Sequence, residues 1–214
     1  MTIQVLICDD HLIVRQGIRQ ILADAPDIAV FGEAGNGPDA IALVREGAAQ
    51  GRRPNVVLMD IAMPSRDGLD VLKALKAEFP KLPVLMLSTY PDRQYAVRSL
   101  KMGAAGYLNK SADSEQMIEA IRKVARGQLF ITHHVAEQLA AALGAGCAPQ
   151  HERLSHREYQ VFRLLASGKS VGEIAEQLVL SPNTVSTYRA RVLEKTGVRN
   201  DVELALYAVR QELV

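Results

Sequence analysis

The stretch Pro54-Asn-Val-Val-Leu-Met-Asp-Ile-Ala-Met-Pro-Ser-Arg-Asp-Gly68 decides the fold of this chain. Its first part, Pro54 to Met59, is an apolar run with the composition of a buried strand, and the carboxylate of Asp60 follows at once. A second apolar run, Ile3 to Cys8, ends in the same way before a pair of acids. A carboxylate at the exit of a buried strand is well placed to act as a nucleophile.

The acids at these two strand ends are expected to converge. Because the C-terminal ends of adjacent parallel strands meet at one crevice, Asp9, Asp10 and Asp60 would lie together. Such a cluster is unstable without a cation, and Mg2+, a hard divalent ion with oxygen ligands, fits it best. The alternative is that an acid only caps the helix after it. We expect capping for Asp67 and metal binding for the other three, because the remaining groups of phosphoryl chemistry follow in order.

Polar side chains also follow two later strands. Ser88 ends the apolar run Pro83 to Leu87, and Lys110 ends the run Gly106 to Asn109. They would bring a hydroxyl and a cation to the same edge of the sheet. Phosphoryl transfer needs such groups, because it depends on positioning and on neutralising the charge of the phosphoryl oxygens.

Strand-like and helix-like segments alternate up to Gly127, which predicts an α/β doubly wound fold with a five-stranded parallel sheet. The strands are expected near Val5, Val30, Val57, Leu85 and Tyr107. The helices are expected over Leu12–Ala23, Pro38–Ala49, Leu69–Glu78, Arg93–Met102 and Ser114–Arg126.

The acid pair, the segment DIAMPSRDG from Asp60, Ser88 and the segment GYLNK that ends at Lys110 occur in register. Together they resemble a response-regulator receiver domain over roughly the first 125 positions. The resemblance implies that Asp60 accepts a phosphoryl group from a sensor histidine kinase. It also implies that Lys110 and Ser88 contact the phosphoryl oxygens, and that Mg2+ is held by Asp9, Asp10, Asp60 and the backbone carbonyl of Ala62.

Ser88 and Tyr107 form the switch pair that the same resemblance implies. The hydroxyl would move to the phosphoryl group, and the aromatic ring would turn inward behind it. The alternative for Tyr107 is an ordinary half-buried aromatic of a strand.

Length and composition limit the class of protein. With 214 residues and 48% apolar composition, the chain is long enough for one to two domains with a sizeable core. It has no apolar run of about eighteen residues and its start leads straight into a strand, so we expect neither a membrane span nor a signal peptide. Cys8 and Cys147 form no disulfide framework, which matches a reducing compartment, the cytoplasm.

The pattern changes after Gly127. We expect one further helix over His133–Leu143 and a linker over Gly144–Gln150, whose small residues break the periodicity. The chain would then consist of a receiver at 1–127, a helix and linker at 128–150, and a small all-α helix-turn-helix domain at 151–214.

Helix-start signals occur in quick succession in the last domain. Ser155–Glu158 and Ser170–Glu173 are capping boxes, and a serine precedes Pro182 at the start of a third helix. The second helix should end near Leu178, which leaves a short turn before the third, as in a helix-turn-helix. Val179 lies in that turn, where a β-branched residue resists a positive φ angle, so either the turn differs or the site is strained.

The third helix has two distinct faces. Val185, Tyr188, Val192 and Thr196 gather on one face, and the opposite face is polar and has small residues. That suits a recognition helix in the major groove, where such side chains meet base edges. We expect DNA contacts from Asn183, Thr184, Ser186, Thr187, Ala190 and Arg191, with Arg189 and Lys195 serving phosphates. The alternative is a solvated surface helix.

The segment LSHREYQVFRLLASGKSVGEIAEQLVLSPNTVSTYRARVLEKTGVRN, which begins at Leu154, resembles a LuxR-type DNA-binding domain that reaches about Val209. Joined to a receiver, this is the architecture of the NarL/FixJ response regulators. The resemblance implies a phosphorylation-controlled transcriptional regulator of a two-component system that binds double-stranded DNA and is not an enzyme. The alternative is a phosphorylation-independent interaction protein on a receiver scaffold, which the loss of an acid or of Lys110 would favour.

A homodimer is expected after phosphorylation, because one such small domain reads only a few base pairs. The final helix, expected over Asp201–Glu212, presents more apolar surface than one packing face requires. This surface comprises Val202, Leu204, Ala205, Leu206, Ala208 and Val209. It would pair with a second copy or, alternatively, dock on the receiver in the resting monomer.

Overall fold

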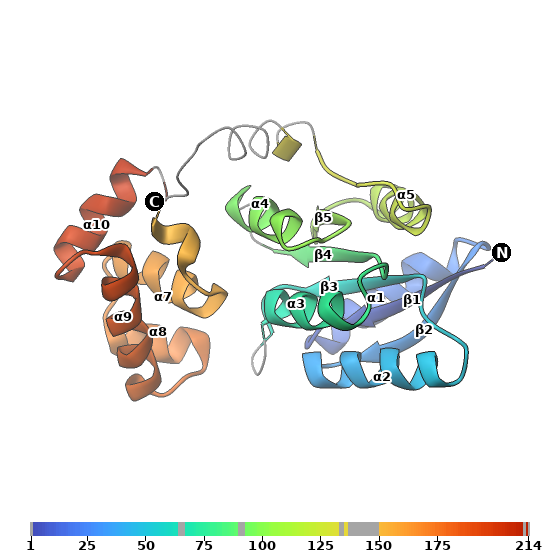
Figure 1. Ribbon diagram of the computed structural model, residues 1–214, viewed down its shortest axis with the longest axis horizontal. Helices are drawn as coiled ribbons and strands as arrows, with labels where there is room; N and C mark the ends of the chain where they lie inside the picture. The colour runs from blue at the N-terminus through green and yellow to red at the C-terminus, as the bar shows by residue number, and fades with distance from the viewer. Residues whose placement is uncertain are drawn as a thin grey trace. The chain divides into compact units, whose positions relative to one another are not determined.

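Five parallel strands form the centre of the N-terminal part of the computed structural model, in the order β2-β1-β3-β4-β5 (Figure 1). They span Ile3–Cys8 (β1), Ile28–Ala34 (β2), Val56–Asp60 (β3), Val84–Ser88 (β4) and Gly106–Asn109 (β5). This confirms the predicted doubly wound α/β fold. The strand order reverses between β1 and β3, so a crevice is expected at the C-terminal ends of these two strands.

Helices cover both faces of the sheet (Figure 1). On one face α1 (Leu12–Ala23) contacts α5 (Ser114–Ala125), and on the other α2 (Gly37–Ala49) contacts α3 (Gly68–Glu78). α4 (Arg93–Lys101) lies against β5. Each of the five predicted helices is confirmed to within one residue at either end.

The three central strands β1, β3 and β4 are buried on both faces over most of their length, as expected for a parallel sheet between two helical layers, whereas β2 and β5 at the edges are largely half-buried. Val5 and Ile7 of β1 belong to one apolar cluster with Ile18 of α1 and Ile121 of α5. Leu6, between them, points to the opposite face, and it too is fully buried. This packing fixes the strands, and with them the side chains at their ends.

Short helices make up the C-terminal part. A 3-10 turn, η1 (Gln150–Arg153), precedes α7 (His156–Ala166), α8 (Val171–Leu178), α9 (Pro182–Thr196) and α10 (Asp201–Arg210). Aromatic rings pack together in the core, where the Phe162 centroid lies 5.7 Å from that of Tyr159 and 6.3 Å from that of Tyr207. α8 and α9 contact each other across a short turn, which confirms the predicted small all-α helix-turn-helix domain.

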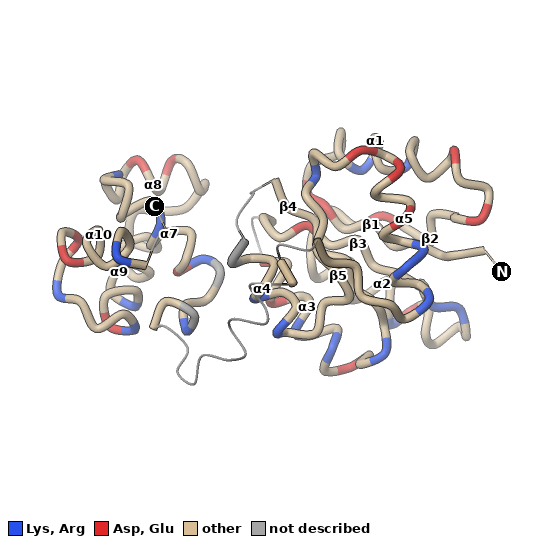
Figure 2. Tube along the Cα trace, turned by 90° about the horizontal axis from the view of Figure 1, so that it is seen from above, with Lys and Arg blue, Asp and Glu red and all other residues tan. Residues whose placement is uncertain are grey.

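The structure describes residues 2–63, 67–89, 93–132, 135–136, 150–211 and 213. The chain divides into two compact units, Met1–Gly144 and Ala145–Val214. Of the predicted helix 133–143 and linker 144–150, all but residues 135, 136 and 150 lie outside the described residues. Within the described ranges, no helix is both long and apolar enough to cross a membrane. Basic and acidic residues are interspersed along both units (Figure 2).

Candidate functional site

Three acidic side chains meet where β1 and β3 end. Asp60 is the last residue of β3, and Asp9 and Asp10 directly follow β1, its neighbour in the sheet. Asp9 is fully buried and Asp60 is 1% exposed. One potential ligand atom from each of these acids and one from His11 all lie within 4.8 Å of one another. The structure thus brings the three predicted acids together and adds a histidine to them.

Lys110 brings its ammonium to the same point from the end of β5. Its Nζ lies 2.5 Å from Asp9 Oδ2 and 2.9 Å from Asp60 Oδ2. Burial lowers the pKa of Lys110, but Asp60 and Asp9 outweigh burial and hold that pKa above its usual value. One ammonium beside three ionised carboxylates would leave two negative charges, which favours binding of a cation there.

The surroundings of Asp60 disfavour its charged form. Burial raises its pKa, Lys110 lowers it and Asp9 raises it again, so the pKa lies above its usual value. Asp60 Oδ1 accepts a hydrogen bond from the Ala62 N–H at 3.3 Å. Oδ2 faces the Lys110 ammonium without a well-aligned hydrogen bond. A cation at this point would stabilise the carboxylate and leave an oxygen able to attack phosphorus.

Asp67 and Gly68 form the start of α3, next to the end of β3. Asp67 caps α3, as predicted, and its Oδ1 accepts the Leu69 N–H at 3.0 Å. Gly68 lies directly against the backbone of Asp60, since a Cβ on Gly68 would be 2.0 Å from the Asp60 carbonyl oxygen. Only glycine permits this approach. Gly68 therefore helps to position Asp60.

Ser88 and Tyr107, the predicted switch pair, lie on neighbouring strands. Ser88 ends β4 and is 1% exposed, and its carbonyl accepts the Lys110 N–H at 2.8 Å. Tyr107 is half-buried on β5 and is paired in register with Met86, two residues before Ser88. Because side chains alternate between faces, Ser88 and Tyr107 lie on the same face of the sheet. This placement suits a coupled movement of the two side chains.

Two further residues near the acids were not predicted from the sequence. His11 is the fourth member of the cluster. Arg15 donates from Nη1 to the Asp9 carbonyl at 2.7 Å, which helps to fix the end of β1. Their signal in the sequence is a histidine directly after the acid pair and an arginine four residues later, a spacing that places both on one side of a helix.

The turn between α8 and α9 is held by caps. Both predicted capping boxes form, and Ser181 Oγ accepts the Thr184 N–H at 3.1 Å. Val179 ends α8 with φ 54° and ψ 51°, and it is 86% exposed. This left-handed conformation is unfavourable for a β-branched residue. Of the two alternatives for this turn, the strained one is therefore confirmed.

The two faces of α9 are as predicted in their burial. Val185, Val192 and Thr196 are buried, and Tyr188 is half-buried. On the opposite face Asn183, Ser186, Thr187, Ala190 and Arg191 are exposed, and Thr184 is half-buried. Arg191 forms no ion pair with any residue in the described part of the chain. This face is accessible to a ligand.

Arg189 and Lys195, the residues predicted to serve phosphates, already have acidic partners. Arg189 Nε lies 2.8 Å from Asp201 Oδ1, and Lys195 Nζ lies 2.6 Å from Glu158 Oε2. Burial raises the pKa of Glu158, but Lys195 and Ser155 together lower it by more than burial raises it. The pKa of Glu158 therefore lies below its usual value. These pairs join α9 to α10 and α7. A phosphate contact by Lys195 would compete with an ion pair that supports the fold.

The surface of α10 carries an apolar stripe. Leu204 and Ala208 are fully buried, whereas Val202, Leu206 and Val209 are 71%, 54% and 63% exposed. The three exposed residues are spaced by four and three positions, which places them on one side of the helix. We call them the α10 stripe.

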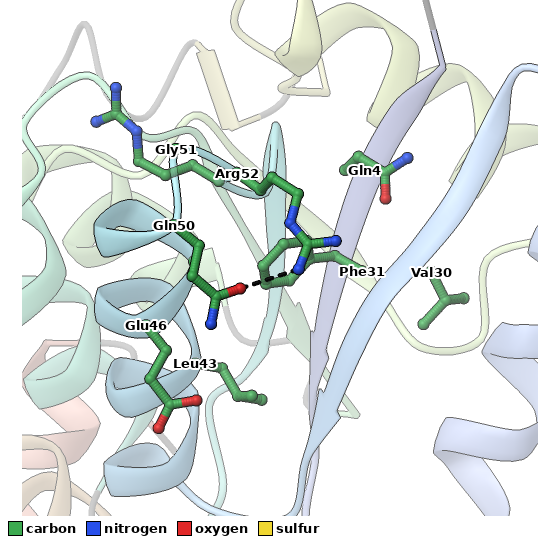
Figure 3. A pocket seen from close by; sticks show the side chains of 10 residues that line it. Gln4, Val30, Phe31, Leu43, Glu46, Gln50, Gly51 and Arg52 are labelled. Carbon is green, nitrogen blue, oxygen red and sulfur yellow. Dashed lines mark hydrogen bonds between the residues drawn. The ribbon is translucent and has the colours of Figure 1, made fainter.

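A separate hollow of about 680 Å³ is lined by residues of β2, of the C-terminal half of α2 and of the segment that follows α2, and none of the clustered acids lines it (Figure 3). Phe31 and Leu43 line it together with charged residues of both signs. Arg52 Nη2 donates to Gln50 Oε1 at 2.9 Å across its rim. It holds no converging set of reactive groups, so the acid cluster is the better candidate site.

Family models match both units of the chain. Residues 5–122 match the response regulator receiver domain, and residues 152–208 match the bacterial regulatory proteins of the luxR family. The response regulator GacA of Pseudomonas aeruginosa is 41% identical over 216 residues, which cover 99% of this chain and 98% of that protein.

Solved structures of RcsB are similar over the whole length. RcsB from Salmonella enterica serovar Typhimurium, bound to promoter rprA in the presence of the phosphomimetic BeF3-, is 29% identical with a TM-score of 0.60 and covers 96% of this chain and 98% of its own. A structure of two RcsB dimers bound to two parallel DNAs is 28% identical with a TM-score of 0.60 and covers 100% of both chains.

Proposed function

Because the chain belongs to the two-component response regulators that join a receiver to a LuxR-type DNA-binding domain, we propose that phosphorylation of Asp60 controls its output. The protein is a DNA-binding transcriptional regulator and not an enzyme. One observation carries the proposal: Asp60 is buried beside Asp9, with the Lys110 ammonium 2.9 Å from its Oδ2. We assign the receiver to 1–127, a helix and linker to 128–150 and the DNA-binding domain to 151–214.

The phosphoryl group comes from a sensor histidine kinase. Its bond to the kinase imidazole breaks as a bond to a carboxylate oxygen of Asp60 forms. Lys110 neutralises charge on the transferred oxygens, and the Ser88 hydroxyl contacts one of them. Asp9, Asp10, Asp60 and the Ala62 carbonyl would hold Mg2+, which supplies further positive charge to the phosphoryl oxygens. The two uncompensated negative charges of the cluster support a divalent ion there.

The signal then passes to DNA. Ser88 moves to the phosphoryl group and Tyr107 turns inward behind it, on the same face of the sheet. The exposed face of α9 enters the major groove, with Ser186, Thr187, Ala190 and Arg191 at the bases. Asn183 and Thr184 also contact the DNA, and Arg189 and Lys195 lie near phosphates. The α10 stripe pairs two copies of the chain. The structure of RcsB dimers on DNA supports a dimer as the DNA-binding form. Such a protein acts on the chromosome and so works in the cytoplasm.

Intact-mass spectrometry tests the proposal. Acetyl phosphate with Mg2+ should add one phosphoryl group to the wild type and none to Asp60→Asn. Asp70→Asn, which changes an exposed acid on α3, is the matched control and should be labelled like the wild type. Labelling of Asp60→Asn at the wild-type rate, or labelling that excess chelator does not reduce, would contradict the proposal.

A further inference from the structure

The outer edge of β5 is covered by the segment 128–131, which we call the strap. β5 is the last strand in the order of the sheet, and backbone groups at such an edge need partners. The Phe130 N–H donates to the Ala105 carbonyl at 2.9 Å, and the Phe130 carbonyl accepts the Tyr107 N–H at 3.3 Å. These two bonds form a parallel bridge between Phe130 and Gly106. The strap therefore extends the sheet by one paired residue beyond β5.

Gly106 permits the strap to lie this close. A Cβ on Gly106 would be 2.6 Å from the Phe130 carbonyl oxygen and 3.0 Å from the Phe130 Cβ. The ring of Phe130 is half-buried and packs against the apolar cluster that includes residues of α5. Lys123 Nζ lies 5.7 Å from the centroid of this ring. The strap is thus held by two hydrogen bonds and one ring, a set of contacts small enough to open while the receiver stays folded.

β5 connects the strap to the candidate phosphorylation site. It is a strand of four residues, and Lys110 directly follows its end. The Lys110 ammonium lies beside Asp60, and transfer of a phosphoryl group would draw it to the new oxygens. Tyr107, which is expected to turn inward, is the residue whose N–H the strap carbonyl accepts. Both changes act on β5, so they bear directly on the bonds that hold the strap.

We propose that the strap is closed on β5 in the unphosphorylated protein and that phosphorylation of Asp60 opens it. Opening would release the start of the segment that leads to the DNA-binding domain. This inference rests on the proposed function, because it concerns how phosphorylation is transmitted, and it adds a backbone contact to the switch pair. Coupling between two events is reciprocal, so a strap opened by mutation should favour the DNA-binding state without phosphorylation.

Hydrogen exchange at single backbone amides of the full chain, followed by nuclear magnetic resonance, tests the opening. The Phe130 N–H should exchange at least about tenfold faster when Mg2+ and beryllofluoride are added. The Ala105 N–H is the internal control, because it donates to the Val84 carbonyl at 2.8 Å on the other side of β5. It should stay protected in both states. Unchanged exchange at Phe130, or an equal loss of protection at Ala105, would overturn the proposal.

Two substitutions test the coupling without phosphorylation. Gly106→Ala pushes a Cβ against the strap, and Phe130→Ala removes the packed ring and leaves β5 unchanged. Leu129→Ala is the matched control, because Leu129 belongs to the strap but is 61% exposed. The first two variants should show fast exchange at residue 130 and should bind DNA at least about fivefold more tightly than the unphosphorylated wild type. The control should behave like the wild type.

The affinities decide whether the strap belongs to the switch. Their ligand is a genomic DNA fragment selected by the phosphorylated protein. Fast exchange at residue 130 in Phe130→Ala with an unchanged affinity for this fragment would overturn the proposal, and so would an equal gain of affinity in Leu129→Ala.

Intact-mass labelling of Asp60 separates this proposal from the phosphorylation proposal. Normal labelling together with a strap that stays closed would overturn only the role of the strap. Absence of labelling would overturn the phosphorylation proposal, and the role of the strap with it.

Discussion

Asp60 costs the folded receiver stability at neutral pH, because burial raises its pKa, Lys110 only partly offsets this, and Asp9 adds to it. A carboxyl group whose pKa is raised on folding stabilises the protein below its unfolded pKa. That contribution is lost as the pH rises through the higher, folded value. The proposed attack on phosphorus nevertheless requires the ionised form of Asp60. Reactivity and stability therefore conflict at this residue.

Asp60→Asn should accordingly raise the free energy of unfolding by about 1–3 kcal/mol at pH 7 without divalent cations, because it removes a buried charge. The difference should shrink as the pH falls to the usual pKa of aspartate, where the wild-type carboxyl group is neutral as well. Urea denaturation across this pH range measures it. Asp70→Asn should change stability by no more than about 0.5 kcal/mol. A less stable Asp60→Asn at pH 7 would mean that the Lys110 pair outweighs burial.

Gly68 permits a second test close to the same carboxylate. Gly68→Ala would place a Cβ 2.0 Å from the Asp60 carbonyl oxygen, so the backbone must move. We expect a loss of about 2 kcal/mol or more in the free energy of unfolding, together with slower labelling by acetyl phosphate. Gly17→Ala, in the exposed part of α1 with no atom within 4 Å of the new Cβ, should instead stabilise by about 0.5–1 kcal/mol. Equal effects of the two substitutions would contradict the close-packing argument.

The turn between α8 and α9 stores strain at Val179. A left-handed conformation costs a non-glycine residue about 1–2 kcal/mol, and glycine avoids this cost. Part of that advantage is offset because glycine loses more conformational entropy on folding. Val179→Gly should therefore stabilise the C-terminal domain by about 1 kcal/mol. Val202→Gly, the same change at an exposed helical position of α10, should destabilise it by about 1 kcal/mol. Thermal unfolding of both variants distinguishes the two cases, and a destabilised Val179→Gly would refute the strain.

α9 carries two cations whose removal should have different effects. Lys195→Ala leaves the buried Glu158 without its ammonium partner and should cost about 1–3 kcal/mol of stability at pH 7. The pKa of Glu158 lies below its usual value on folding, so this cost should fall as the pH drops through that folded pKa. Urea denaturation at pH 7 and at acidic pH measures this change.

Arg191→Ala serves as the matched comparison, because Arg191 is exposed and makes no ion pair among the described residues. It should leave stability unchanged but weaken specific DNA binding by about 1–3 kcal/mol and relax base preference. Equal losses on specific and random DNA would remove Arg191 from the base-reading face. If Lys195→Ala is as stable as the wild type, the ion pair with Glu158 does not support the fold, and phosphate binding is the remaining role for Lys195.

The regular elements were predictable because their signals are local. Helix periodicity, capping residues and apolar runs set the bounds of α1 to α5, and each strand-end acid follows directly from its strand. The pair of Lys195 and Glu158 was not predictable, because it joins residues 37 positions apart through tertiary packing. The place of His11 in the cluster also depends on a side-chain orientation that spacing does not reveal. The strain at Val179 was recognised only as one of two alternatives.

Pairing of two chains through the α10 stripe can be tested on the whole molecule. Leu206→Glu places a charge within the stripe and should keep the phosphorylated protein monomeric and weaken its DNA binding. Leu129→Glu makes the same change at an exposed leucine of the N-terminal unit and should pair normally. Light scattering with and without beryllofluoride gives the molar mass. A dimer of normal strength in Leu206→Glu would assign pairing to another surface.

Control of DNA binding by Asp60 is tested most directly by one comparison of affinities. The ligand is a DNA fragment selected from genomic DNA by the phosphorylated protein. The dissociation constant of its complex is measured with the wild type and with Asp60→Asn. Each protein is measured before and after treatment with acetyl phosphate and Mg2+. Phosphorylation should tighten binding by the wild type about tenfold or more, as expected for a coupling free energy of about 1–3 kcal/mol, and should leave Asp60→Asn unchanged. An unchanged wild type, or an equal gain in Asp60→Asn, would contradict control through this residue.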